Sequence, residues 1–142
     1  MSITGLRVFD ETLHLTNTWL KGVMSAIGND DRNDAYAALR ATLHALRDRL
    51  TVDEAVQLGA QLPMLVRGFY YEGWHPAGRP YRERSQEVFL AHVQEELRGR
   101  EHLDPERVAR GVFRVLEEHV SGGEIEQVKR ALPKPIRELW PG

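Results

Sequence analysis

No cysteine occurs among the 142 residues of the chain, so it has neither a disulfide bond nor a thiolate metal site. It also lacks any apolar stretch that approaches the roughly 20 residues needed to cross a bilayer. The segment Met1–Asp10 has no basic region followed by an apolar run, and we therefore expect no signal peptide. These absences predict a soluble, cytoplasmic protein.

Neither sign of charge is in excess. The formal net charge is −2, with 7 basic and 8 acidic residues in the first half (1–71) and 12 and 13 in the second half (72–142). Nucleic acids and anionic membranes are bound through basic patches, and no such patch stands out here. We therefore expect no membrane partner and no nucleic-acid partner. The length is that of one domain, which can bury about 70% of its unfolded surface.

Motifs of common catalytic sites are also absent. The chain has no Gly-x-Ser-x-Gly elbow and no glycine-rich phosphate loop, and none of its six histidines belongs to a His-Glu-x-x-His motif. Glu-x-x-His occurs at Glu11–His14 and Glu72–His75, and a carboxylate-bridged metal site would need both on facing helices. Gly73 and Pro76 interrupt the second of these, which favours solvated or capping histidines. We predict no catalytic residue, no metal site and no cofactor, and the balance favours a non-enzymatic protein.

The chain does contain an internal repeat with a displacement of 70 residues. Residues 12–72 align with residues 82–142 without a gap. The identical pairs are Leu20/Leu90, Val23/Val93, Asp34/Asp104, Arg40/Arg110, Leu46/Leu116, Glu54/Glu124, Gln57/Gln127, Leu62/Leu132, Pro63/Pro133 and Arg67/Arg137. Conservative pairs include Trp19/Phe89, Leu43/Phe113, Thr51/Ser121 and Tyr70/Trp140. The repeat predicts that one structural unit is present twice.

Apolar residues recur at helical spacing in the first copy. The two stripes consist of Phe9, Leu13, Thr16, Leu20, Val23 and Ile27, and of Tyr36, Leu39, Leu43, Leu46 and Leu50. The first stripe predicts a helix that ends at Gly28-Asn29. The second predicts a helix whose cap is Asp30, Asp31 or Asp34.

Two short helices are predicted to follow. Thr51 and Glu54 form a capping box, in which the hydroxyl and the carboxylate each accept from a free backbone N–H, and this box opens a third helix that reaches about Gln61. Pro63 is tolerated in the first turn of a fourth helix, because that position has no N–H to lose. The second copy has the same signals in the same order, at Asp104-Pro105, in a capping box of Ser121 and Glu124, and at Leu132-Pro133.

No strand-like alternation and no hairpin signal occurs. The sequence therefore predicts an all-α fold, in which a duplicated four-helix motif gives about eight helices, several of them short, packed as one pseudo-twofold domain. The expected boundaries are residues 1–71 for the first repeat, 72–81 for a linker with two Gly and two Pro, and 82–142 for the second repeat. A unit of about 60 residues has little core of its own, which favours joint packing over the alternative of two independent domains.

One polar row on the second predicted helix is a candidate binding site. Arg40, His44 and Arg47 share a face, and Asp48 lies one turn from His44. A cationic row beside an acid could hold an anionic ligand. It could equally form a solvated ladder of weak pairs. Arg40 and Arg67 recur in the second copy, which favours a repeated structural contact to helix carbonyls or to the capping-box acid.

Aromatic residues gather where the first copy meets the linker. They are Phe69, Tyr70, Tyr71, Trp74 and Tyr81. Tyr and Trp are common in pockets and partner grooves, but they could also seal the junction of the two copies. Tyr70 corresponds to Trp140, which favours sealing for both, whereas Tyr71–Trp74 has no counterpart. The candidate ligand-binding residues are Arg40, His44, Arg47, Arg67, Tyr70, Tyr71 and Trp74.

The helix pairs over 51–70 and 121–140 superficially resemble a helix-turn-helix. The second pair carries basic residues at Lys129, Arg130, Lys134 and Arg137. The break at Leu-Pro, the shortness of the fourth helix and the negative net charge argue against DNA binding.

Several segments resemble a known family over essentially the whole chain. They include Thr16-Asn17, Trp19-Leu20, Leu43–Leu50, Gln61–Pro63, His119–Ser121 and, as the most specific, the Arg-Gly-x-Tyr-Tyr-Glu-Gly-Trp run over 67–74. The chain is similar to the family called domain of unknown function 2267. The resemblance implies a small helical bacterial or archaeal protein. The resemblance implies no activity, and it implies only an association with stress physiology, through stress-associated genes that are expected beside family members.

Two functional hypotheses follow. The first is a non-enzymatic protein-interaction or stress-associated regulatory protein, whose partner is another protein or a second copy in a homodimer. The alternative is a small-ligand or anion-binding protein that uses the Arg/His helix face and the Tyr/Trp-rich segment 70–74. A closed aromatic cavity with an inward arginine would favour the ligand, and an exposed apolar patch would favour a protein partner.

Overall fold

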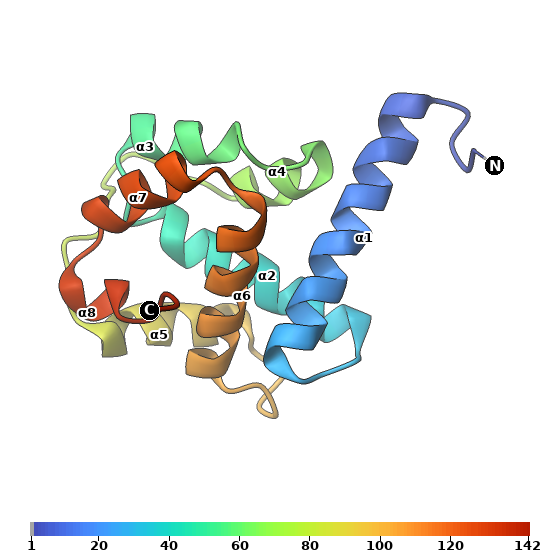
Figure 1. Cartoon of the computed structure of the whole chain (residues 1–142). Helices are drawn as coiled ribbons and strands as arrows, with labels where there is room; N and C mark the ends of the chain where they lie inside the picture. Colours follow the sequence, from blue (N-terminus) through green and yellow to red (C-terminus); the bar gives the residue numbers. More distant parts are fainter. Residues whose placement is uncertain (1) are drawn as a thin grey trace.

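Every helix except α1 begins at a polar cap or a proline that the sequence provides. In a computed structural model that describes residues 2–142, eight α-helices and no strands are found (Figure 1). They are α1 (Arg7–Ile27), α2 (Arg32–Arg47), α3 (Val52–Gly59), α4 (Met64–Tyr71), α5 (Gln86–Glu96), α6 (Pro105–His119), α7 (Gly122–Ala131) and α8 (Lys134–Arg137). The all-α prediction is confirmed.

Local signals account for most helix ends. Asp31 is the cap of α2 and accepts from the Asp34 backbone N–H at 3.0 Å. α1 stops at Gly28, whose φ of 67° is the left-handed conformation that glycine adopts most easily. Pro63 and Pro133 occupy the N-cap positions of α4 and α8, one residue earlier than predicted.

The two expected capping boxes differ. At Thr51 both reciprocal bonds form, with the Glu54 carboxylate accepting from the Thr51 N–H at 2.9 Å. Ser121 accepts from the Glu124 N–H, but its own N–H donates to the Gln61 side chain at 3.2 Å. The prediction that Glu124 reaches back is therefore wrong. Because α3 packs on α7, Gln61 is close enough to take that place.

One hydrophobic core is shared by the two halves of the chain. α2 and α6 pack on each other at its centre, and each of them also contacts both α1 and α5 (Figure 1). The core includes Trp19, Leu39, Leu43, Leu46, Phe89, Val112, Phe113 and Leu116, all of them buried. From Ala37 onward α2 is buried on nearly every side, so its polar residues Thr42, His44 and Arg47 face protein rather than water.

The close crossing of α1 and α6 depends on a glycine. A β-carbon on Gly111 would lie 2.6 Å from Cγ2 of Ile27 and 3.3 Å from Cβ of Ala26. Real β-carbons do not approach so closely, so any larger side chain would push the two helices apart. The contact holds the C-terminal half of α1 against α6.

The N-terminal part of α1 has no helical counterpart among the residues 70 positions later. Under the 70-residue displacement, the start of α5 at Gln86 corresponds to Thr16, so Arg7–Leu15 match a segment without helix. The non-helical linker accordingly extends over residues 72–85, beyond the predicted end at 81. Figure 1 shows this end of α1 projecting from the rest of the molecule. No helix within residues 2–142 is long and apolar enough to span a membrane.

Candidate functional site

The predicted polar row on α2 lies against the end of α4. His44 is 3% exposed, and its ring nitrogens lie 2.6 Å from the Phe69 carbonyl oxygen and 2.8 Å from a Glu96 carboxylate oxygen. Arg47 donates to the carbonyl oxygens of Tyr70 and Glu72 at 2.9 and 3.0 Å. These carbonyls belong to the last turn of α4, which has no partners for them within the helix. The row therefore caps α4 from the side.

His44 has no ring nitrogen left for chemistry. Both of its nitrogens lie within hydrogen-bond distance of oxygen atoms of the protein itself. A general base needs a nitrogen within reach of a substrate proton. The geometry thus gives His44 a structural role between α4 and α5.

Arg40 closes the same cluster from the solvent side. Its guanidinium lies 2.7 Å from a Glu72 carboxylate oxygen and 3.1 Å from a Glu96 carboxylate oxygen. The hydrogen bond from Arg40 lowers the pKa of Glu72, and the bond to Glu72 raises the pKa of Arg40. The structure thus brings Arg40, His44 and Arg47 together with the 70–74 segment, and their polar atoms bind one another.

Arg67 makes a contact that recurs 70 residues later. It donates to the carbonyl oxygens of Gly59 and Leu62, both at 2.9 Å, at the end of α3. Arg137 donates to the carbonyl oxygen of Leu132 at 3.2 Å. The expectation of a repeated arginine contact to helix carbonyls is confirmed for this pair. Arg40 differs from its counterpart Arg110, which binds Glu106 and the Glu138 carbonyl.

The aromatic residues are packed within the chain. Tyr70 is fully buried, its hydroxyl donates to the Ala55 carbonyl at 2.7 Å, and burial raises its pKa well above the ordinary value. Tyr71 stacks on Trp74 with ring centres 5.5 Å apart. The counterpart of Tyr70, Trp140, stacks on Phe113 at 4.2 Å. Tyr70 and Trp140 therefore both seal the core.

A groove that the sequence did not single out lies between α1, α2 and α4. Its volume is about 470 Å³. It is lined by Leu13, Thr16, Asn17, Leu20, Arg32, Asn33, Tyr36, Leu65, Gly68, Phe69 and Glu72. We call this the α1–α4 groove. The sequence places Leu13 and Thr16 in one apolar stripe with Leu20 and Val23. The residues 70 positions after Leu13 and Thr16 are the polar Glu83 and Gln86, and this difference was the available signal.

The wall of the groove contains an unused polar atom. The Thr16 hydroxyl is buried, and no residue in the described range 2–142 bonds to it. Gly68 forms part of the opposite side, and a β-carbon there would meet nothing within 4 Å. The groove thus has space at Gly68 and a free hydrogen-bonding group at Thr16.

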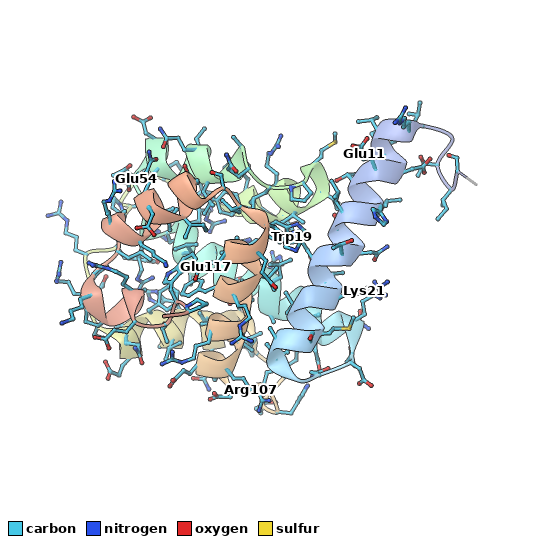
Figure 2. The ribbon with its side chains drawn as sticks, viewed as in Figure 1. Glu11, Trp19, Lys21, Glu54, Arg107 and Glu117 are labelled. Atoms are coloured by element: carbon cyan, nitrogen blue, oxygen red, sulfur yellow. The ribbon has the colours of Figure 1, made fainter. Side chains whose placement is uncertain are left out.

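The exposed large apolar residues of the chain lie on three surfaces: the first part of α1, the groove region and α3. We define the α1 arm as Arg7–Leu15. Side chains of large apolar residues are exposed at Ile3, Leu6, Val8, Phe9 and Leu15 in or next to the arm, at Tyr36, Met64 and Leu65 around the groove, and at Val52 and Val56 on α3. Figure 2 shows Glu11 on the projecting arm, whereas Trp19 points toward α6. The stripe is buried from Thr16 onward, half-buried at Leu13 and exposed at Phe9.

Among residues 2–142, no group of three or more His, Asp and Glu is arranged to hold a metal ion. No curated protein matches the chain. Residues 16–139 match the family described as an uncharacterised conserved protein, DUF2267, and because this match spans most of the fold described above, the chain belongs to that family.

Proposed function

We propose that this protein is a non-enzymatic interaction protein that binds an amphipathic helical segment in the α1–α4 groove. The observation that carries the proposal is an open groove with apolar lining at Leu13, Leu20, Tyr36, Leu65 and Phe69, of which Tyr36 and Leu65 are exposed. Contiguous apolar surface of this kind marks interaction sites in soluble proteins. The link to stress physiology remains an expectation from the family resemblance.

The distribution of polarity in the groove fits a helical ligand. The floor is apolar, with Leu13, Leu20 and Phe69, and charges stand at the rim, at Arg32 and Glu72. Protein interfaces commonly combine an apolar centre with a polar edge. A helix that enters such a groove anchors two or three side chains at i, i+3 and i+4 spacing.

The apolar character of the groove is not required by the fold. The residues 70 positions after Leu13, Thr16, Tyr36 and Leu65 are Glu83, Gln86, Glu106 and Pro135. The second half keeps helices with a polar residue or proline at the last three of these places, and Glu83 lies in the non-helical linker. Apolar side chains that the scaffold can do without favour a function for the groove in the first half.

We also propose that the chain is an internal duplication with pseudo-twofold symmetry. The reciprocal contacts support it: the rings of Trp19 and His119 stack at 5.1 Å, and the guanidinium of Arg49 lies 5.0 Å from the ring of Phe89. Positions 19 and 89, and 49 and 119, correspond in the repeat. The helix contacts follow the same exchange, since α1 packs on α6 as α5 packs on α2.

The alternative of a small-ligand or anion binder that uses Arg40, His44 and Arg47 has less support. The donors of these side chains are bonded to Glu72, Glu96 and the end of α4. An anion would have to displace contacts that the fold itself uses. The α1–α4 groove needs no such displacement.

The experiment is a selection of helical peptides from a displayed library on the immobilised protein, with two matched variants. Gly68→Leu fills the groove, and Gly123→Leu places the same side chain on the exposed first turn of α7, where space is also open. We expect selected peptides to lose about tenfold or more in affinity with Gly68→Leu, worth about 1.4 kcal/mol, and little with Gly123→Leu. A library that yields no binder, or binders insensitive to Gly68→Leu, would overturn the proposal.

A further inference from the structure

We infer that the occupant of the α1–α4 groove is a second copy of this chain, with the α1 arm of each copy lying in the groove of the other. The inference rests on the proposed function, because it names the partner of the same groove. It makes the protein a twofold homodimer held by two identical arm–groove contacts.

The arm supplies the apolar side chains that such a contact needs. Phe9 is 45% exposed and Leu6 lies one turn before it, and both continue the stripe whose lower members, Leu20 and Val23, are buried against α2 and α6. A helix stripe stabilises a fold only where it is covered. Here the stripe runs past the end of the molecule on which it packs, so its first two turns lack a cover within residues 2–142.

The arm is ordered before any partner binds. At its free end, the Asp10 carboxylate accepts from the Thr4 backbone N–H at 3.0 Å and from the Thr4 and Ser2 hydroxyls, and these bonds lower the pKa of Asp10. At its base, the Leu65 N–H donates to the Thr12 hydroxyl at 2.9 Å, which ties the arm to α4. A preformed element pays little ordering entropy on association.

Arm and groove adjoin on one side of the molecule. Leu13 belongs to the arm and also lines the groove, so the projecting and the concave surfaces are continuous. A twofold interface requires a self-complementary surface, in which the patch on one copy fits the same patch on the other. A projecting helix next to a groove for a helix meets that requirement.

The area is sufficient for a weak but specific dimer. The nine residues of the arm form a helix about 14 Å long, one side of which offers roughly 300 Å² of accessible surface. Two arms and two grooves together would bury roughly 1,200 Å², the lower end of stable interfaces. We therefore expect a dissociation constant in the micromolar range.

The first test measures mass by sedimentation velocity from about 1 to about 200 µM, where an interface of this size dissociates. We expect a dimer at the upper end. Phe9→Asp on the arm and Gly68→Leu in the groove should each weaken it tenfold or more. Val56→Asp is the matched control, because Val56 is 47% exposed on α3, away from the groove, and it should leave the dimer unchanged.

The second test uses the absence of cysteine in the chain. Single variants Phe9→Cys and Leu65→Cys carry the only thiols, and when mixed and oxidised they should give a mixed disulfide dimer in excess of either same-variant dimer. Circular dichroism establishes that each variant is folded. A monomer at about 200 µM, or a dimer insensitive to both Phe9→Asp and Gly68→Leu, overturns the inference. Groove-dependent peptide binding in that case would leave the proposed function standing, and its loss would remove both.

Discussion

The Nε2 nitrogen of His44 lies 2.6 Å from the carbonyl oxygen of Phe69, so a buried side chain of α2 satisfies the last turn of α4. The other ring nitrogen faces Glu96 before the loop to α6. One imidazole therefore connects three segments that are distant in sequence. This contact explains why a polar row that looks solvent-facing on a helical projection is buried in the fold.

Replacement of His44 should be strongly destabilising. His44→Ala would remove the side chain that lies between the Phe69 carbonyl and the Glu96 carboxylate and would open a cavity, so we expect a loss of about 2–4 kcal/mol in the free energy of unfolding. Urea unfolding followed by circular dichroism measures it. His75→Ala, in the exposed linker, is the control and should change stability by less than about 0.5 kcal/mol. Equal effects of the two variants would contradict the structural role of His44.

The two short-helix caps should be coupled. Thr51→Ala and Ser121→Ala should each cost about 1 kcal/mol. Because α3 packs on α7 and Gln61 bonds to the Ser121 N–H, we expect the double variant to deviate from the sum of the single losses by about 0.5 kcal/mol or more. Denaturant midpoints of both single variants and the double variant test this, and strict additivity would mean that the caps act independently.

The carboxylate of Asp34 should make stability fall in acid. The hydrogen bond from His102 lowers the pKa of Asp34 below its ordinary value, and bonds from Asn29 and Arg100 lower it further. A carboxylate with a depressed folded-state pKa stabilises fully above its unfolded pKa of about 3.9, and that stability is lost as the pH falls through the folded value. The free energies of unfolding of the wild type and of Asp34→Asn, measured between about pH 7 and pH 2.5, should therefore become more similar as the pH falls. A constant difference would exclude this contribution.

Arg47, the last residue of α2, and Arg49, two residues later, are both buried, but removal of their charge should change stability differently. Arg49 is 4% exposed, lies over the rings of Phe89 and Tyr81, and has no carboxylate within ion-pair distance among residues 2–142. Burial lowers the pKa of Arg49, which reflects the unfavourable desolvation of its charge. Arg49→Met keeps the packing and should be neutral or stabilising. Arg47→Met leaves two carbonyl oxygens without their hydrogen-bond donor. It should lower the free energy of unfolding, measured by thermal or urea unfolding, by about 2–3 kcal/mol. The same loss for both would contradict the distinction.

Two helical glycines should have opposite responses to alanine. Gly68→Ala adds a methyl group in open space within α4 and should stabilise by about 0.5–1 kcal/mol through helix propensity. Gly111→Ala places a β-carbon 2.6 Å from Ile27 and should destabilise by about 1–3 kcal/mol. Melting temperatures of the two variants measure the contrast. A stabilising Gly111→Ala would show that α1 and α6 can separate without loss.

The sequence by itself determined the helices, because their starts and stops depend on neighbours in the chain. Asp31 and Thr51 bond to N–H groups three residues on, and Gly28 ends α1 through a backbone conformation that glycine adopts without strain. Such interactions have the same energy whatever surrounds the helix. Helical periodicity likewise predicted which faces are apolar.

Only the tertiary structure decided which of those faces is covered. Phe9 and Val23 belong to one stripe, yet Phe9 is exposed and Val23 is buried. The reason is that α2 and α6 pack on the C-terminal half of α1 and not on its N-terminal end. Arg40, His44 and Arg47 were predicted to share a face, but their partners come from distant residues. His44 and Arg47 bind the carbonyls of Phe69 and Tyr70, and Arg40 binds the carboxylate of Glu72. Burial and polar pairing are set by segments distant in sequence, so the pattern within one helix cannot contain them.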